Sequence, residues 1–254
     1  MTKLKIISWN INGLRTRFKN KQLDPIFDEN PDIILFQETK AKYDQLDPKL
    51  KEMLEYNLYI SPSENVRSGG IATFSKIKPN FIKKFFKTPN SEFKARILNF
   101  DLEDLKLIHI YGPTGSSTKT NFESKLSFYQ ELVDYSKEIA NDNVIIAGDF
   151  NIAHNEKDVS DPESAATSPN FLKEERKFLD ELENLGFKDA YRLLNPDTEE
   201  YSSWKSAKAR KSNQGFRLDY FFVSNSLKDS IIETKILSNI EGSKHAPIEI
   251  IIDI

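Results

Sequence analysis

Cysteine is absent from this chain of 254 residues. Its absence excludes disulfide bonds, zinc–thiolate sites and cysteine nucleophiles, and it is compatible with a reducing compartment. Long hydrophobic runs are absent as well: none approaches the ~18–20 residues that a membrane-spanning helix needs, and no hydrophobic signal segment follows Met1. We therefore expect a soluble, cytoplasmic protein with no membrane partner.

An excess of charge of one sign is also missing. Charged residues make up 30% of the chain, but the formal net charge is only −3. The overall field would therefore not draw the protein to DNA or to an acidic membrane. Local basic stretches at 15–21, 76–87 and 204–211 could still contact an anionic partner, or they could be solvated faces.

Hydrophobic residues make up 38% of the sequence, enough for a large core, and we expect a single domain over residues 1–254. Apolar runs bounded by turn-forming residues predict strands, and helical spacing of apolar residues predicts helices. Strands mixed with helices predict an α/β fold of two packed sheets flanked by helices. The expected strands are 4–10, 32–37, 57–61, 70–75, 95–101, 105–111, 143–149, 217–223, 232–237 and 247–253; the expected helices are 21–29, 44–55, 119–140 and 171–185; and 152–170 is expected to be a loop.

Three apolar runs, in "KIISWNING", "DIILFQETK" and "AGDFNIAH", end in polar residues. A single acid at a strand end is usually a turn former or a helix cap, but three such ends together predict one shared polar site. A few carboxylates combined with amides suit Mg²⁺ or Mn²⁺, which keep several water ligands and rely on substrate phosphate to complete their shell. The residues concerned are Asn10, Asn12, Gln37, Glu38, Asp149 and Asn151.

Two later segments, "RLDYFFVS" and "GSKHAPI", contribute Asp219 and His245. A buried aspartate paired with this histidine would fix its tautomer and stabilise its protonated form. The alternative for His245 is a structural histidine with no part in chemistry. We assign no chemistry to His109 or His154.

Six motifs together resemble those of the exonuclease III / AP endonuclease family: "SWNINGLR", "LFQETK", "IYGPTG", "GDFNIAHNEKDV", "GFRLDYFFVS" and "GSKHAPI". They occur in that family's order from residue 4 to the end of the chain. The QE and GDFN motifs mark only the wider superfamily, whereas "SWNxNGLR", "QETK" and "AR..N.G.RLDY" are more specific to the DNA-repair branch. The resemblance implies a four-layer α/β sandwich of the DNase I-like kind.

The resemblance also implies roles for individual residues. Glu38 is expected to be the principal ligand of Mg²⁺, with Mn²⁺ as a possible substitute and Asn10 beside it. Asp149 should activate the attacking water, and Asn151 should position that water and the phosphate; both are further candidate metal ligands. His245, held by Asp219, should hydrogen-bond a phosphate oxygen, and Tyr111 should lie against the scissile phosphate.

Contacts to the substrate follow from the same resemblance, as do three departures from the family pattern. Ser203 stands at a family aromatic position, Lys94 replaces the acid of an "EGR" motif, and Lys244 replaces an acid beside the histidine. Lys244 could point into solvent, or it could reach a DNA phosphate or an acid of the site. The expected substrate-binding residues are Asn12, Arg15, Arg96, Arg210, Asn213 and, in a pocket for a sugar without a base, Phe216 and Leu218.

The expected activity is Mg²⁺-dependent cleavage of the phosphodiester 5′ to abasic sites, with 3′→5′ exonuclease or 3′-phosphodiesterase activity. The expected partner is double-stranded DNA with abasic sites or 3′ ends, bound by a monomer associated with the nucleoid. One alternative is a phosphoesterase for a small or lipid phosphate on the same fold. Another is a DNA-binding homologue that has lost activity.

Overall fold

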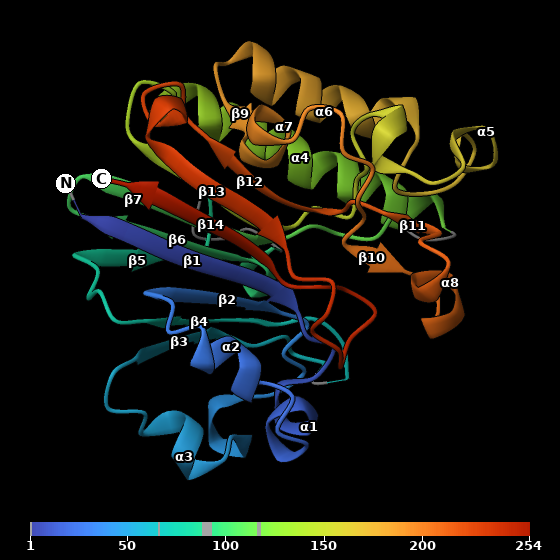
Figure 1. Ribbon diagram of the computed structural model, residues 1–254. Helices are drawn as coiled ribbons and strands as arrows, with labels where there is room; N and C mark the ends of the chain where they lie inside the picture. Colours follow the sequence, from blue (N-terminus) through green and yellow to red (C-terminus); the bar gives the residue numbers. More distant parts are fainter. Residues whose placement is uncertain (1, 66, 88–92, 116–117) are drawn as a thin grey trace.

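Two six-stranded mixed β-sheets pack face to face between two groups of helices (Figure 1). The computed structural model describes residues 2–65, 67–87, 93–115 and 118–254. From one side to the other, the layers are the helices of the first fifth of the chain, the first sheet, the second sheet, and the long helices of the middle of the chain. This arrangement confirms the expected four-layer α/β sandwich.

The first sheet has the strand order β13-β14-β1-β2-β4-β3. Strands β1 and β2 are parallel, and β14, close to the end of the chain, pairs antiparallel with β1. Both ends of the described chain therefore belong to one sheet. The strands are β1 (Lys3–Asn10), β2 (Ile33–Gln37), β3 (Asn57–Ser61), β4 (Ile71–Ser75), β13 (Ile231–Ile236) and β14 (Ile248–Asp253).

The second sheet has the strand order β5-β6-β7-β8-β12-β9. Strands β7 and β8 are parallel, and β12 runs antiparallel to β8. A separate two-stranded ribbon joins β10 and β11. The strands are β5 (Phe81–Lys83), β6 (Ile97–Leu102), β7 (Leu105–Tyr111), β8 (Val144–Asp149), β9 (Lys188–Asp189), β10 (Ser203–Trp204), β11 (Gly215–Phe216) and β12 (Asp219–Val223).

The helices cover the outer faces of the two sheets, and no described helix is long and apolar enough to cross a membrane. Four short 3₁₀ helices lie at Tyr43–Gln45, Lys94–Arg96, Glu156–Asp158 and Lys228–Ser230. The α-helices are α1 (Leu14–Lys19), α2 (Asp24–Asp28), α3 (Pro48–Lys51), α4 (Lys119–Ile139), α5 (Pro162–Ala165), α6 (Lys173–Asn184), α7 (Ala190–Leu194) and α8 (Ala207–Lys211).

All the expected strands are present, with ends within two residues of the predicted ones, whereas the helices needed correction. The helix expected at 44–55 is wrong: proline disfavours helix at the preceding residue, and the chain instead starts a new, short helix at Pro48, capped by Asp47. The helix at 21–29 shrinks to α2, and the short α1 was not expected. The expected loop 152–170 contains α5.

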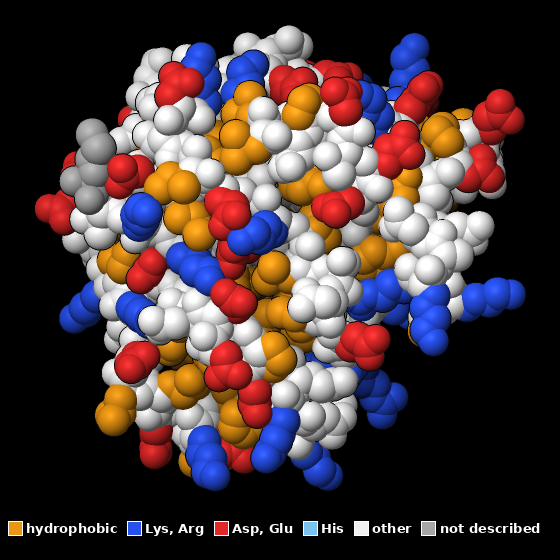
Figure 2. Space-filling model, in the orientation of Figure 1, with side chains coloured by type: hydrophobic (Ala, Val, Ile, Leu, Met, Phe, Trp, Pro, Cys, Tyr) orange, Lys and Arg blue, Asp and Glu red, His pale blue; other side chains and the backbone are white. Residues whose placement is uncertain are grey.

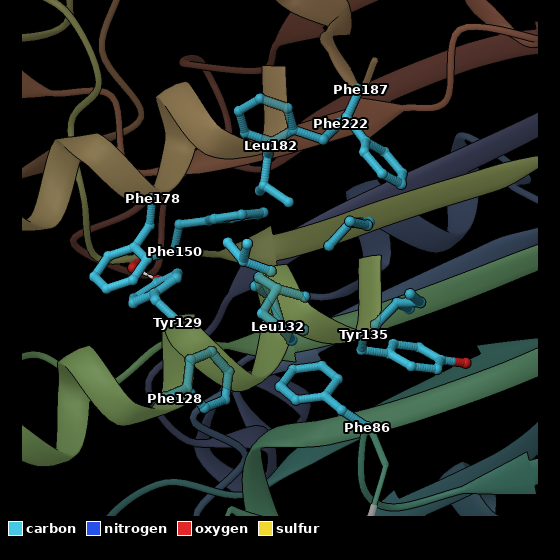
Figure 3. Close-up of a cluster of buried hydrophobic side chains, with 14 of the residues drawn as sticks. Phe86, Phe128, Tyr129, Leu132, Tyr135, Phe150, Phe178, Leu182, Phe187 and Phe222 are labelled. Carbon is cyan, nitrogen blue, oxygen red and sulfur yellow. Dashed lines mark hydrogen bonds between the residues drawn. The ribbon is translucent and has the colours of Figure 1, made fainter. Parts of the chain in front are cut away.

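Alternation along the strands sorts side chains into three cores. Odd positions of β7, such as Leu105 and Leu107, face the other sheet, and even positions, such as Ile108 and Ile110, face the long helices. Figure 3 shows the latter cluster, in which aromatic rings of α4 and α6 pack on β8 and β12. On α4, the buried residues of this cluster are Phe128, Tyr129, Leu132, Val133, Tyr135 and Ile139.

Candidate active site

The candidate site lies where polar strand ends from both sheets meet. In the first sheet, Asn10 at the end of β1 lies beside Gln37 at the end of β2. In the second sheet, Tyr111 at the end of β7 lies beside Asp149 at the end of β8. Because parallel strands end at the same edge and the two sheets pack together, the structure brings the three polar motifs into one place.

A hydrogen-bonded network joins the acids and amides of the two sheets. The side-chain nitrogen of Asn10 donates to Glu38 Oε1 at 3.0 Å and to Asp149 Oδ2 at 2.8 Å. The backbone N–H of Asn151 donates to Asp149 Oδ1 at 2.9 Å, and its side-chain nitrogen donates to Oδ2 at 3.2 Å. Asp149 is thus held at both oxygens. The backbone N–H of Asn12 donates to Asn10 Oδ1 at 3.3 Å, which places Asn12 next to the network.

Asp149 follows a glycine that the packing of β8 requires. Gly148 has φ of 141°, and a Cβ at this position would lie 1.9 Å from the carbonyl oxygen of Ile110 on β7. Any larger residue would push apart the two strands that carry Tyr111 and Asp149.

The pKa values of Asp149 and His245 are both raised above their ordinary values. Complete burial is the largest cause for Asp149 and raises the pKa of its carboxyl to about 7, with His245 opposing this effect and Asp219 adding to it. Burial alone would lower the pKa of His245, but the negative charges of Asp219 and Asp149 outweigh it and raise that pKa to about 9. At neutral pH the site therefore contains a carboxyl group that can both gain and lose a proton, next to a protonated imidazole.

The predicted pairing of Asp219 with His245 is present. Asp219 Oδ2 lies 2.8 Å from His245 Nδ1 and also accepts a 2.6 Å hydrogen bond from the Ser202 hydroxyl. The other ring nitrogen, Nε2, lies 3.9 Å from Asp149 Oδ2 and 3.2 Å from the Ser203 hydroxyl. Ser203, at the position where an aromatic residue was expected, thus contacts the ring nitrogen that faces the site.

Glu38 is the most accessible acid of the network, with 23% of its side chain exposed. Its Oε1 accepts from Asn10 and, at 3.1 Å, from the Tyr111 hydroxyl, while its Oε2 lies 2.9 Å from the ammonium of Lys40. Burial alone would raise the pKa of Glu38, but the hydrogen bonds from Asn10 and Lys40 hold it below its ordinary value. Glu38 is therefore a carboxylate at neutral pH.

Left-handed backbone conformations concentrate at this site. The φ angles are 49° at Asn12, 52° at Glu38, 50° at Lys40 and 52° at Asn151. Such conformations are costly for residues other than glycine and persist only where surrounding structure enforces them. Here they turn the chain sharply after each strand, so that consecutive side chains face the site.

The donor set fits a hard divalent cation. Carboxylate and amide oxygens are the ligands that Mg²⁺ and Mn²⁺ prefer, and Glu38 Oε2 already attracts the cation of Lys40. Asp149, Asp219 and His245 also offer ligand atoms within 4.8 Å of one another. Because His245 holds a proton at neutral pH, this buried triad supplies oxygens rather than a nitrogen ligand.

Arg96 and Tyr111 form a pair beside the network. The guanidinium of Arg96 lies 4.7 Å from the centre of the Tyr111 ring and donates to the carbonyl oxygens of Tyr111 and Gly112 at 3.1 and 3.3 Å. Burial and the charge of Glu38 raise the pKa of Tyr111 above its ordinary value. Tyr111 is therefore a hydrogen-bond donor, and Arg96 is held close to the site despite the change of the motif to "KAR".

Of the other expected substrate contacts, some are exposed and one is held by hydrogen bonds to the backbone. Arg15 is exposed on α1, and Asn213 is exposed just after α8. Arg210 donates to the backbone carbonyls of Ser238, Ser243 and Ile240, so its donors hold the loop that precedes His245.

Phe216 and Leu218 lie together in a small apolar cluster. Leu218 is buried, and Phe216 is partly buried. Phe216 pairs with Ser203 across the ribbon of β10 and β11, which brings this cluster next to His245. The remaining members of the cluster are Ala153, Val159, Ala165 and Phe171.

A cleft of about 550 Å³ lies between α8, the loop before His245 and the start of α1. Lys211 and Lys244 line it and are exposed, and Asn12 connects it to the site. In the orientation of Figure 1, Lys and Arg side chains gather around α8 (Figure 2). Among the described residues, Lys244 has no carboxylate within ion-pair distance.

The three basic segments do not share one location. The segments 15–21 and 204–211 form α1 and α8 and flank this cleft. The segment 76–87 follows Ser75, which pairs with Ile33 at the start of β2, the end of the strand opposite to Glu38. The third segment therefore begins away from the site.

Comparison with known proteins agrees with the motifs. The sequence model of the Endonuclease/Exonuclease/phosphatase family matches residues 7–238. An exodeoxyribonuclease of Bacillus subtilis is 32% identical over 99% of this chain and 100% of its own length. The chain belongs to this family. The DNA repair nuclease APEX1 of Danio rerio is 31% identical over 96% of this chain and 81% of its own length.

Solved structures show the same fold. An AP endonuclease from Archaeoglobus fulgidus superposes with a TM-score of 0.89 at 21% identity, over 99% of this chain and 100% of that one. A 3′ phosphatase, NExo from Neisseria, solved with a product DNA hairpin, also gives 0.89, at 23% identity over 99% and 100%. The resemblance inferred from the motifs to exonuclease III and AP endonucleases is thereby confirmed.

Two lysines of this family member were missed by the sequence reasoning. Lys40 lies inside the "QETK" motif, whose spacing after Glu38 could have indicated it. Lys125 is fully buried within α4, and its ammonium donates to the Asn151 carbonyl at 2.7 Å and to Glu175 Oε1 at 2.6 Å. A lysine in a helix of mixed composition gives no local signal of such a role.

Proposed function

We propose that the chain is a Mg²⁺-dependent DNA repair nuclease that cleaves the phosphodiester 5′ to abasic sites, with 3′→5′ exonuclease or 3′-phosphodiesterase activity. The observation that carries this proposal is the closed network of Glu38, Asn10 and Asp149 beside the His245–Asp219 pair. A carboxylate for a metal, a carboxyl group for a proton and an imidazolium for a phosphate meet in one place.

Glu38 and Asn10 would hold the metal, with Asp149 and Asn151 as further candidate ligands. Bound there, Mg²⁺ would polarise the phosphate and stabilise the leaving oxyanion. Mn²⁺ has the same preference for oxygen ligands and could replace it.

Asp149 would act as the general base. A water molecule attacks phosphorus in line with the leaving oxygen, the bond from phosphorus to that oxygen breaks, and the water proton passes to Asp149. The amide of Asn151, which donates to Asp149, would orient the water and the phosphate. No covalent intermediate is needed.

His245 and Tyr111 would neutralise the charge that develops on the phosphate. Protonated His245 donates through Nε2 to a non-bridging oxygen, while Asp219 holds Nδ1. Tyr111, kept protonated by burial and by Glu38, would donate to the phosphate when its hydroxyl turns away from Glu38. Asp149, His245 and Tyr111 thus supply the base and the donors from three different strands or strand ends.

Abasic specificity would come from fit. Phe216 and Leu218 belong to an apolar cluster close to His245 that suits a sugar without a base, and such a sugar leaves the helix at low cost because it is unpaired. Ser203 is smaller than the aromatic residue of the family pattern and would leave more room beside Phe216, its partner across the ribbon. The degree of discrimination against normal nucleotides therefore depends on how much space remains between Ser203 and the apolar cluster.

Backbone phosphates would be held by the two basic helices. Arg17 of α1 and Arg210 and Lys211 of α8 line the cleft next to Asn12. Contacts of lysine and arginine with backbone phosphates position DNA without reading its sequence. Two relatives, an exodeoxyribonuclease and a DNA repair nuclease, support a DNA substrate. The neighbour with a product hairpin, described as a 3′ phosphatase, supports activity at 3′ ends.

Residues 1–254 would form one catalytic domain that acts as a monomer, because both halves of one chain supply residues of the site. A DNA repair substrate would place the protein with the nucleoid in the cytoplasm.

The test is a substrate panel with Mg²⁺ and with EDTA. It compares a duplex with one abasic analogue, an undamaged duplex with a recessed 3′ end, and small phosphodiesters. We expect Mg²⁺-dependent incision of the first and slower trimming of the second. Cleavage of only the small esters would support the alternative phosphoesterase, and DNA binding without cleavage at any Mg²⁺ or Mn²⁺ concentration would support the inactive homologue.

A further inference from the structure

The interface between the sheets changes from apolar to polar as it approaches the site. On β7, the residues that face the first sheet are Leu105, Leu107 and then His109. On β2, the corresponding series ends in Gln37. A layer of buried polar side chains therefore separates the apolar core from the catalytic residues. We call this layer the floor network; it consists of Ser8, Gln37, Thr73 and His109.

The floor network crosses from one sheet to the other through His109. Gln37 Nε2 lies 2.8 Å from His109 Nε2, and Thr73 Oγ1 lies 3.0 Å from His109 Nδ1. The Ser8 hydroxyl oxygen lies 3.0 Å from the same Gln37 nitrogen. Ser8, Gln37 and Thr73 come from β1, β2 and β4 of the first sheet, whereas His109 comes from β7 of the second.

The protonation state of His109 follows from these contacts. The Gln37 nitrogen also donates to the carbonyl oxygen of Leu35 at 3.2 Å, which fixes the orientation of the amide. His109 Nε2 must then accept, and Nδ1 carries the hydrogen and donates to Thr73. Complete burial lowers the pKa of His109 to about 3, so this neutral tautomer persists over the whole working pH range.

The contact between Gln37 and His109 lies directly beneath a second cross-sheet contact. Glu38 follows Gln37 in the chain, and Tyr111 is the next residue of β7 that faces the first sheet after His109. The hydroxyl of Tyr111 donates to Glu38 Oε1 at 3.1 Å. Two successive contacts, Gln37–His109 and Glu38–Tyr111, thus join the same two strands, and the first is fully buried.

Polar groups at this depth carry a cost that apolar residues would avoid. Gln37 Oε1 is buried without a hydrogen-bond partner, and an unsatisfied buried polar atom is destabilising. Leucine and isoleucine fill the same interface one layer deeper. Directional hydrogen bonds fix the relative position of two strands more closely than apolar packing does. Next to a site assembled from both sheets, this precision can outweigh the loss of stability.

We propose that His109 and Gln37 are positioning residues of the nuclease site, which set the distance between β2 and β7 and thereby hold Glu38 where it can bind the metal. The inference rests on the proposed function for the identity of the metal site. It adds two residues that do not touch substrate or metal. Outer residues of this kind typically change metal affinity or activity by about 10–100-fold when they are replaced.

The experiment compares His109→Leu with a matched control, Asn99→Leu. Asn99 lies on the neighbouring strand β6, is buried, and donates to the Tyr135 hydroxyl at 2.8 Å on the helix-covered side of the sheet. Both variants lose a buried hydrogen bond and should melt at lower temperature. His109→Gln, which can accept from Gln37 and donate to Thr73, serves as the conservative rescue. Thr73→Val provides a milder variant if His109→Leu does not fold.

Mg²⁺ binding is measured by calorimetry without DNA, and cleavage of the abasic duplex is measured in single turnover. For His109→Leu we expect metal binding weakened by about tenfold or more and a slower cleavage step at saturating Mg²⁺. DNA affinity in EDTA should be unchanged, and His109→Gln should recover most of both losses. Asn99→Leu should keep the wild-type metal affinity and rate, and Thr73→Val should shift both in the direction of His109→Leu.

The inference would be overturned if the stability of His109→Leu fell like that of Asn99→Leu while metal affinity and cleavage rate stayed within twofold of wild type. Unchanged values for a folded Thr73→Val would count equally against it. A wild type that binds Mg²⁺ but cleaves no DNA would instead refute the proposed function, and the comparison of metal affinities would still decide the role of His109.

Discussion

Burial and charge would prepare Asp149 and His245 for the two opposite tasks proposed for them, those of a base and a proton donor. Asp149 must lose its proton to act as a base, and its pKa is raised to about 7 by burial. His245 must keep its proton to donate to phosphate, and its pKa is raised to about 9 by two carboxylates. The competent pair therefore exists above the first value and below the second.

The pH dependence of kcat/KM on the abasic duplex should accordingly be bell-shaped. The basic limb should lie near pH 9, where His245 loses its proton, and the acid limb should lie at or below about 7, because a bound cation favours the carboxylate of Asp149. In His245→Asn the basic limb should disappear. A wild-type profile that stays flat between pH 6 and pH 10, values that bracket both limbs by about one unit, would contradict the assignment.

Lys40 occupies the oxygen of Glu38 on which a metal would act. Its ammonium contacts Glu38 Oε2 at 2.9 Å and also the side-chain oxygen of Asn12. Removal of this competing cation in Lys40→Met should tighten Mg²⁺ binding by about fivefold, which corresponds to the ~1 kcal/mol of a partly exposed ion pair.

Calorimetric titration of wild type, Lys40→Met and the control Lys42→Met checks this effect. Lys42 is exposed two residues further along, so its replacement should leave the affinity unchanged. Weaker Mg²⁺ binding in Lys40→Met would mean that the lysine orders Glu38 rather than competing for it.

At the scale of secondary structure, α4 supports the loop that follows β8 through one buried ion pair. Lys125 and Glu175 both have fully buried side chains, and Lys125 also donates to the carbonyl of Asn151. Breaking a buried pair from one side costs about 3–5 kcal/mol, whereas replacing both partners with neutral groups is much better tolerated.

Lys125→Met should therefore unfold at clearly lower temperature, and Lys125→Met/Glu175→Gln should recover much of that loss. The cleavage rate should stay reduced in both, because neither variant restores the donor to the Asn151 carbonyl. Melting curves and single-turnover rates separate the two effects. A double variant that recovers rate and stability together would show that α4 contributes only to folding.

Sequence patterns predicted strands and polar strand ends far better than helices and supporting residues. Apolar runs with polar ends, as in β1, β2 and β8, show in the sequence itself where the strand stops. The carboxyl ends of neighbouring parallel strands must also lie at the same edge of a sheet. The failed helix at 44–55 had helically spaced leucines, but Leu54 is fully exposed and Pro48 restarts the helix. Lys125 and His109 could not be predicted, because their partners are distant in sequence and only the packing of sheets and helices brings them together.

For the whole molecule, the distribution of charge matters more than its sum. The net charge is −3, but α1 and α8 place cations on either side of the cleft that leads to the site. Neutralising about five phosphates would give a slope of about −4.5 in a plot of log affinity against log salt concentration. DNA binding in EDTA should therefore weaken steeply as salt rises.

Charge reversal locates the surface that binds DNA. Lys211→Glu on the rim should weaken binding and flatten the salt dependence by about one unit, whereas Lys78→Glu should do neither. Lys78 is equally exposed and lies in a basic segment that begins at the other end of the sheet. Equal effects of the two variants would mean that DNA is not bound along α1 and α8.

We propose that Glu38 holds the metal with which one polar site, built from both sheets, cleaves DNA. The most direct test measures incision of a duplex with one abasic analogue by wild type, Glu38→Ala and the exposed control Glu55→Ala, with Mg²⁺ and with EDTA. Wild type and Glu55→Ala should incise only with Mg²⁺, and folded Glu38→Ala should be slower by about a hundredfold or more, which corresponds to ~2.7 kcal/mol. Incision by Glu38→Ala at the wild-type rate, or incision by wild type in EDTA, would contradict the account.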